Sequence, residues 1–294
     1  MDFEKAICGM WHITQNELKT NGNSQEALSN IRNKLEPFVF GALEQRYGRE
    51  LTEFWKTYMP PKKARKAFMI TEGRIHPNLW FVLRNVAWAG PDMSVYIFCS
   101  DQNYDYIMGL LGDKAPAFNV IVAFKGDPPK EQAMQDYNNF LTAYTTYQLI
   151  EAEYVMTIQM DVYLRKRLED HLFRYDYMAC RWAWKSDEPG GAVSIRRISK
   201  MVELCRKARP DLAVNCAIPE DEFINRLIIA NNCEQSPMLE NIEYLLESIH
   251  VLNRPQGPHL IVDPFVVHQA WTFSYTFSPQ TFFQFWKELL IMRF

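Results

Sequence analysis

The stretch YVMTIQMDVYL, residues 154–164, carries the strongest indication of the fold. Residues 154–158 are typical of a buried strand, and Gln159, Met160 and Asp161 follow directly. An aspartate at the end of an apolar strand is costly unless something pairs with it. Asp161 is therefore interpreted either as an ordinary polar strand cap or as a ligand for a cation.

Upstream of this stretch, apolar strands alternate with helical patterns. Strands are predicted at 67–71, 94–100 and 118–124, with helices at 77–90, 103–112 and 130–151. This alternation predicts an α/β fold with a mainly parallel sheet and helices on both faces. Ligands of such sheets bind beyond the carboxyl ends of the strands. The polar residues at these ends are Glu72, Arg74, Ser100, Asp101, Lys125, Asp127 and Asp161.

The first 60 residues have a different pattern, with apolar residues at helical spacing from Leu28 to Phe54 and a helix start near Ser24. The segment PPKKARK, residues 60–66, then breaks the helical pattern. It is interpreted as a linker, with a phosphate-binding or membrane-surface patch as the alternative. We therefore expect a helical N-terminal extension at 1–66, which offers a surface for oligomerisation, and a main domain at 67–294.

Downstream of Asp161, the chain has an aromatic strand at 175–184 and a glycine-bearing turn at 186–197 that contains Gly190 and Gly191. Helices are predicted from Ile198 and after Pro219. Residues 260–273 predict two short strands, which end at His268 and Trp271.

The composition excludes several classes of protein. The chain has 294 residues, a net charge of −3 and 48% hydrophobic residues, so nothing predicts a nucleic-acid binder. The six cysteines form no C-x-x-C pair, which favours reduced thiols in a cytoplasmic protein. The sequence contains neither a signal peptide nor an apolar run of about 18 residues, so no membrane span is expected.

A small set of residues has the chemistry of a cation site and a general base. Asp161 offers a carboxylate and His268 an imidazole, a pair of ligands that suits Mn²⁺, while Mg²⁺ prefers the carboxylate. Glu220 and Asp221, together with Glu222, begin a helix and suit a general base. Structural alternatives remain open for all of them: a strand cap, a core histidine and ordinary acidic charge at a helix start.

Several motifs occur in an order that resembles a known family. They are ITEGRIHPNLWFVLRNV, VYIFCSDQN, YNNFLT, VMTIQMD, YDYMACRW, GGAVSIRR, PEDEFI and FVVHQAW, spread over residues 67–273. In this respect the chain is similar to a family of proposed glycosyltransferases that is catalogued as a domain of unknown function. That family is in turn similar to nucleotide-sugar transferases of the GT-A fold, in which a D-x-D motif binds the metal.

The resemblance implies a role for each matching residue. Asp161 matches the last acid of the metal motif, with Gln159 in the partner position, and His268 matches the histidine that closes the metal site. Asp221, in the pair with Glu220, matches the acid that acts as base on the acceptor. Around them, the resemblance implies contacts to the donor from Glu72, Arg74, Gly190 and Gly191, with Trp271 packed beside His268. We expect Asp101, at a strand end, Gln159 and the cation of Arg196 to complete the donor-binding set.

The resemblance therefore implies a metal-dependent glycosyltransferase that moves a sugar from a nucleotide-diphosphate donor to a glycan or another hydroxyl acceptor. We expect Mn²⁺ or Mg²⁺ as the cofactor, and inversion of configuration with Asp221 as base. Gln159, which replaces an acid, keeps a catalytically inactive sugar-binding or protein-binding module open. A metal-dependent nucleotidyltransferase is the second alternative, and it would need more converging carboxylates.

Overall fold

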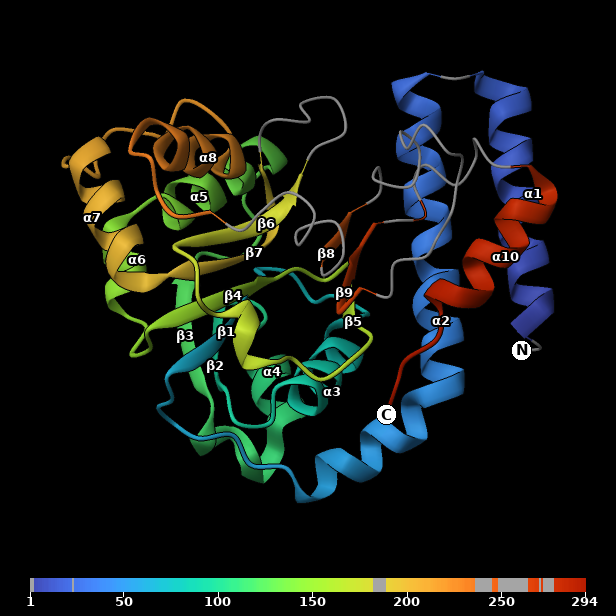
Figure 1. Cartoon of the computed structure of the whole chain (residues 1–294), viewed down its shortest axis with the longest axis horizontal. Helices are drawn as coiled ribbons and strands as arrows, with labels where there is room; N and C mark the ends of the chain where they lie inside the picture. Colours follow the sequence, from blue (N-terminus) through green and yellow to red (C-terminus); the bar gives the residue numbers. More distant parts are fainter. Residues whose placement is uncertain are drawn as a thin grey trace.

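The computed structural model describes residues 3–294 except 23, 182–188, 236–244, 248–263, 270 and 272–277. Its centre is a six-stranded sheet in the order β3-β2-β1-β4-β7-β6 (Figure 1). The first four strands along the chain pair in parallel, whereas β7 pairs antiparallel with both β4 and β6. The predicted α/β class with a mainly parallel sheet is therefore confirmed. The strands are β1 (Lys66–Thr71), β2 (Ser94–Ser100), β3 (Asn119–Phe124), β4 (Tyr154–Ile158), β6 (Tyr177–Arg181) and β7 (Pro189–Arg197).

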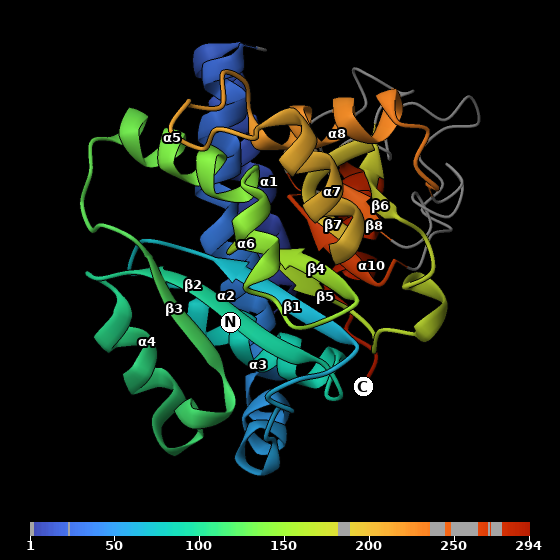
Figure 2. The same cartoon turned by 90° about the vertical axis from the view of Figure 1, so that its left-hand side faces the viewer.

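Helices cover both faces of this sheet (Figure 2). Successive side chains of a strand point to opposite faces. In β1, Phe68 and Ile70 therefore belong to one hydrophobic core, and Ala67 and Met69 to the other. The first face carries α3 (Leu79–Ala89) and α4 (Tyr104–Leu111) with a short 3₁₀ turn, Gly112–Ala117. The second face carries α5 (Lys130–Leu141), α6 (Tyr144–Gln148), α7 (Ile198–Ala208) and α8 (Glu220–Ala230).

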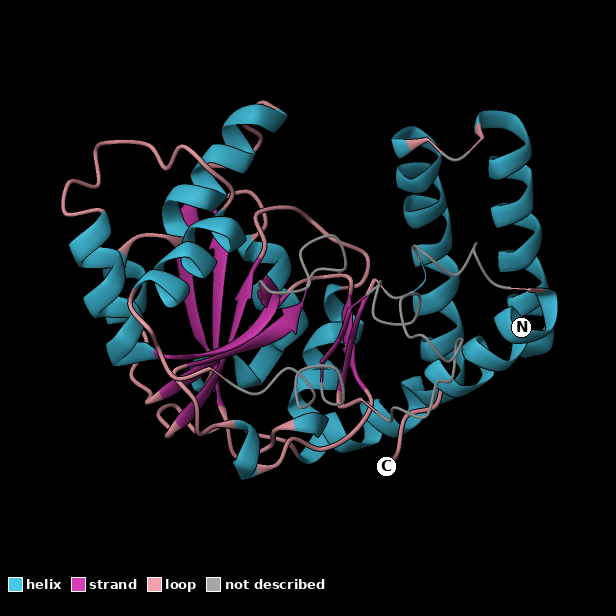
Figure 3. Ribbon diagram, turned by 45° about the horizontal axis from the view of Figure 1, so that its top comes forward, coloured by secondary structure: helices cyan, strands magenta, loops and turns pink. Residues whose placement is uncertain are grey.

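The N-terminal residues form an antiparallel hairpin of two helices, α1 (Phe3–Asn21) and α2 (Gln25–Thr57), crossed by α10 (Pro279–Leu289) (Figure 1). Ser24 caps α2 as predicted, since its hydroxyl accepts a hydrogen bond from the amide of Ala27 at 3.1 Å. A small sheet lies between α2 and the main sheet (Figure 3). Its strands, in the order β5-β9-β8, are β5 (Val162–Leu164), β9 (Val266–His268) and β8 (Leu245–Glu247).

Arg84 on α3 ties the helical hairpin to the rest of the fold. Its guanidinium is buried and donates to the carbonyl of Gly48 at 3.0 Å and to the hydroxyl of Thr52 at 2.8 Å. It also pairs with the carboxylate of Glu44 at 2.6 Å. All three partners lie on α2, so α2 has a fixed position over α3. Apolar residues of α1, α2 and α10 belong to the same core as α3.

The basic segment between α2 and β1 is held against the main domain. Lys62 donates to the carbonyl of Phe118 at 2.6 Å, and Arg65 pairs with Glu153 at 2.7 Å. Lys63 pairs with Glu151. The segment therefore connects α2 to β1 as the linker interpretation requires, and these basic side chains already have partners.

Three local predictions differ from the structure. The helix expected at 130–151 is divided between α5 and α6, because the Thr142 hydroxyl bonds back to the carbonyl of Asn138 at 2.7 Å and Ala143 is extended. The prediction of a glycine-bearing turn is wrong, because Gly190 and Gly191 lie in β7, which pairs with β6. Trp271 ends no described strand, and residues 260–263 of that predicted segment lie outside the described residues.

Among the helices of the described part of the chain, none combines the length and the apolar character needed to cross a membrane.

Candidate active site

Asp161 and His268 lie together although they are far apart in the sequence. Asp161 directly precedes β5, and in the antiparallel pair of β5 with β9, His268 is opposite Val162. The His268 Nε2 atom is therefore only 3.4 Å from Asp161 Oδ1. Both side chains are largely shielded from solvent, with 6% of His268 and 18% of Asp161 exposed. The predicted convergence of carboxylate and imidazole is thus present in the structure.

The carboxylate of Asp161 is strongly stabilised in its ionised form. Burial by itself would raise the pKa of Asp161, but the charge of His268 and hydrogen bonds from His268 and Gln269 lower it to about 2. The amide of Gln269 donates to the second carboxylate oxygen of Asp161. Asp161 is therefore a fixed negative charge at neutral pH.

The loop after β1 carries a rigid pair of opposite charges. The guanidinium of Arg74 makes two hydrogen bonds to the carboxylate of Glu72, from Nε and Nη2, each of 2.8 Å. The side chain of Glu72 is 6% exposed, whereas that of Arg74 is 75% exposed. Asn103 holds the loop by donating to the carbonyls of Glu72 and Arg74 at 2.8 Å. Since β1 and β4 are neighbours and parallel, this loop and Asp161 lie at the same edge of the sheet.

A third carboxylate, Glu36, reaches this region from α2, and the sequence analysis missed it. Asn78 donates from Nδ2 to Glu36 Oε1 at 2.8 Å and to the carbonyl of Met160 at 3.1 Å. His76 Nε2 lies 3.7 Å from the same oxygen of Glu36. Glu36 belongs to the polar part of a predicted helix, and nothing in its sequence neighbourhood distinguishes it from the other acids there.

Gln159 occupies the partner position of the resembled metal motif but binds elsewhere. Its Nε2 atom is 3.0 Å from the hydroxyl of Tyr137 on α5. Burial raises the pKa of Tyr137, and the charge of Glu220 raises it further, so this hydroxyl stays protonated. Gln159 therefore connects the edge of β4 to α5.

Arg196 and Glu220 form a buried ion pair. Both side chains are at least nine-tenths buried, and the guanidinium of Arg196 also donates to the hydroxyls of Tyr147 and Ser194 at 2.6 and 2.8 Å. Burial raises the pKa of Glu220, and the pairing with Arg196 opposes that rise. These contacts give both residues a structural role in joining β7 to α8, and the functional roles predicted for them stay predictions.

The other predicted site residues are distributed around these groups. Asp221 is half-buried in the first turn of α8, where it accepts from the amide of Glu222 at 2.8 Å. Asp101 is exposed and accepts from the amide of Gly126 at 2.5 Å, which fixes the loop after β3. Trp271 is buried, and its ring lies edge-on to that of Phe40 on α2, with 6.4 Å between the ring centroids.

The Asp161–His268 pair has the chemistry of a partial cation site. The part of the chain described by the structure holds no group of three or more acidic, histidine or cysteine side chains placed to bind a metal. A carboxylate and an imidazole nevertheless suit Mn²⁺, and donor phosphates with water would have to fill the remaining positions. The residues present therefore fit a divalent cation that binds together with a diphosphate.

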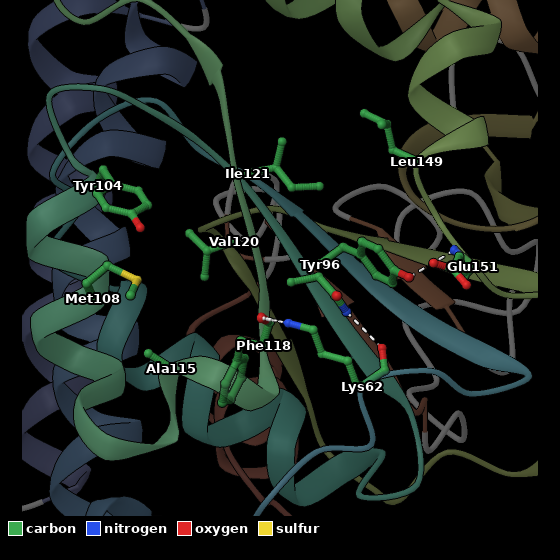
Figure 4. A pocket seen from close by; sticks show the side chains of 11 residues that line it. Lys62, Tyr96, Tyr104, Met108, Ala115, Phe118, Val120, Ile121, Leu149 and Glu151 are labelled. Carbon is green, nitrogen blue, oxygen red and sulfur yellow. Dashed lines mark hydrogen bonds between the residues drawn. The ribbon is translucent and has the colours of Figure 1, made fainter.

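A separate cavity of about 320 Å³ lies on the sheet near its edge strand β3 (Figure 4). None of the predicted site residues lines it. Its wall includes Tyr96, whose hydroxyl accepts from the amide of Glu151 at 2.9 Å, together with Tyr104, Ile121 and Leu149. This cavity is therefore distinct from the Asp161–His268 region.

Comparison with known proteins gives a partial family match and a distant structural likeness. A family described as "Protein of unknown function (DUF5672)" matches residues 124–250, which include Gln159, Asp161, Arg196 and the start of α8. A search among curated proteins found no match. Among solved structures, the chain is similar to a galactosyltransferase, LgtC, in complex with donor and acceptor sugar analogues. That likeness has a TM-score of 0.47 and 9% identity, and covers 69% of this chain and 86% of the other.

Proposed function

We propose that this protein is a metal-dependent glycosyltransferase that uses a nucleotide-diphosphate sugar as donor and a hydroxyl group, such as that of a glycan, as acceptor. The observation that carries the proposal is the 3.4 Å contact between Asp161 and His268 at the carboxyl end of β4. Ligands of open α/β sheets bind at this end of the strands. Two of the resembled motifs, VMTIQMD and FVVHQAW, supply these two residues.

In glycosyl transfer, negative charge develops on the departing nucleoside diphosphate. The enzyme has to stabilise this charge. A divalent cation, when bound, supplies Lewis-acid stabilisation of this charge. Asp161 and His268 would hold the cation, and the hydrogen bond from Gln269 keeps the Asp161 carboxylate in one orientation. The exposed guanidinium of Arg74, fixed by Glu72, offers a further positive charge for the diphosphate.

Asp221 is the proposed base that takes the proton from the acceptor hydroxyl, which implies inversion of configuration. It is half-buried at the start of α8, whereas the neighbouring Glu220 is engaged by the guanidinium of Arg196. A carboxylate that is occupied by a buried cation is a poor proton acceptor. Between the two acids, Asp221 is thus the better candidate, and general base catalysis contributes typically 10²–10⁴-fold in rate.

The proposal is tested by incubating the protein with a panel of nucleotide sugars and Mn²⁺ and measuring the release of nucleoside diphosphate. We expect release with at least one donor, its loss in EDTA, and its loss in Asp161→Asn. Asp113→Asn serves as a matched control because Asp113 is exposed in the 3₁₀ turn that precedes β3, at the opposite end of that strand from the loops of the site. Asp221→Asn should lower turnover by about 10²-fold or more while donor binding persists.

Other outcomes would contradict the proposal. Tight binding of a nucleotide sugar without turnover, with any acceptor mixture, would favour an inactive binding module. Pyrophosphate release from a nucleoside triphosphate would favour a nucleotidyltransferase. Turnover that is unaffected by Asp161→Asn would remove the proposed site.

A further inference from the structure

The carboxylate of Glu36 is fixed in place next to the residue that precedes Asp161. The Nδ2 group of Asn78 donates one hydrogen bond to Glu36 Oε1 at 2.8 Å and another to the carbonyl of Met160 at 3.1 Å. Asn78 is buried, so this double contact is shielded from solvent. A single amide group thus joins a side chain of the N-terminal helix α2 to the backbone beside Asp161.

His76 supports this arrangement without cancelling the charge of Glu36. Its Nδ1 atom accepts from the amide of Asn78 at 3.2 Å, so Nε2, which lies 3.7 Å from Glu36, carries the hydrogen. Burial lowers the pKa of His76, which keeps the imidazole mainly neutral at pH 7. His76 therefore leaves the negative charge of Glu36 in place.

Glu36 and Asp161 lie in each other's electrostatic field. Burial raises the pKa of Glu36, and the negative charge of Asp161 raises it further. Arg32 and Arg74 oppose this rise, but Arg74 is already bonded through two nitrogen atoms to Glu72. The carboxylates of Glu36 and Asp161 thus repel each other, and a bound cation would relieve this repulsion.

We propose that Glu36 of the N-terminal helix strengthens cation binding at the Asp161–His268 pair through its charge and through water, without being a direct ligand. This inference rests on the proposed function and extends it, because it makes α2 one wall of the site. Direct ligation is set aside because no three acidic or histidine side chains are clustered for a metal among the described residues. Groups in the outer shell of a metal site typically change its affinity by 10–100-fold when mutated.

The test is a titration of the full-length protein with Mn²⁺ alone, followed by the loss of the free-ion electron paramagnetic resonance signal. Asp161→Asn should abolish binding. Glu36→Gln, which keeps an oxygen that can accept from Asn78 but removes the charge, should weaken the affinity about 10-fold. The matched control is Glu53→Gln on the same helix. Glu53 is 60% exposed and pairs with Lys56, and its separation of 17 positions places it about 25 Å from Glu36 along the helix axis.

The outcomes separate this inference from the proposed function. If Asp161→Asn abolishes Mn²⁺ binding while Glu36→Gln binds as tightly as the wild type, the role of Glu36 is refuted and the metal site stands. If the wild-type protein binds no Mn²⁺, the metal requirement of the proposed function fails together with this inference.

A further variant separates charge from structure. Glu36→Asp keeps the charge and should retain an affinity closer to that of the wild type than Glu36→Gln does. Equal weakening by the two variants would refute an effect of charge. If Glu36→Gln folds poorly, Glu36→Ala removes the same charge and is compared with Glu36→Asp in its place.

Discussion

The imidazole of His268 faces the carboxylate of Asp161 because the backbone of β9 pairs antiparallel with that of β5, with His268 opposite Val162. The relationship depends on three residues of each strand, and β5 itself is held by α3. The position of Asp161 is thus determined by the same contacts that stabilise the small sheet.

Asp161 should make stability depend on pH in the acid range. Its pKa is about 2 in the folded protein and 3.8 for the free side chain, so its contribution is present above pH 3.8 and is lost as the pH falls through 2. The full difference corresponds to about 2 kcal/mol, of which about 1 kcal/mol is lost by pH 3. Urea unfolding of metal-free protein between about pH 5 and pH 3 should show this loss for the wild type and not for Asp161→Asn.

Removing Glu220 should destabilise the fold strongly. Glu220→Ala leaves the guanidinium of Arg196 buried without its carboxylate, which costs about 3–5 kcal/mol. Glu222→Ala, on the same helix, breaks only a partly exposed pair with Arg226 and should cost less than about 0.5 kcal/mol. Chemical denaturation compares the two variants. Similar stabilities would show that the buried pair contributes little to the fold.

Asn85 should be essential for the position of β5. Its side chain donates to the carbonyl of Leu164 at 2.9 Å and accepts from the amide of Leu164 at 2.7 Å, and all of these groups are buried. Asn85→Ala leaves two backbone groups unsatisfied, at about 1–3 kcal/mol each. We expect a loss of about 2–5 kcal/mol in the free energy of unfolding and weaker Mn²⁺ binding. A variant with unchanged stability would mean that water replaces both bonds.

Cysteine reactivity should follow burial. Cys8 is exposed, whereas burial raises the pKa of Cys99 to about 11 and that of Cys205 to about 12. Since the thiolate is the reactive form, iodoacetamide at pH 8 should label Cys8 first and leave Cys99 and Cys205 unmodified. Mass spectrometry of the labelled peptides measures this order. In denaturant the three should react at similar rates, and rapid labelling of Cys205 in native buffer would contradict its burial.

Much of the sheet was predictable from local pattern. The strand beginning at Lys66, the strands around Phe98 and Val122 and the strand before Gln159 are apolar runs bounded by turn signals, so their boundaries agree with prediction to within about two residues. Gly190 and Gly191 were misassigned because a glycine pair is locally typical of a turn, whereas here it lies within β7, whose residues on both sides of the pair are paired with β6.

Two residues of the resembled motifs make structural contacts that the motif alone does not predict. The Arg84–Asn85 pair lies in a helical pattern, and its spacing predicts only an amphipathic helix. In the structure, Arg84 holds α2 and Asn85 holds β5. Both contacts join segments far apart in the sequence, so no local periodicity reports them.

The sequence by itself determined the succession of strands and helices and the chemical types of Asp161 and His268, because these depend on neighbouring residues and on side-chain identity. Only the tertiary structure decided that the two side chains lie 3.4 Å apart, that Arg196 and Glu220 form a buried ion pair, and that Asn78 joins Glu36 of the N-terminal helix to the backbone beside Asp161. The physical reason is that electrostatic and hydrogen-bond energies depend on distance and burial in space, which separation along the chain does not specify.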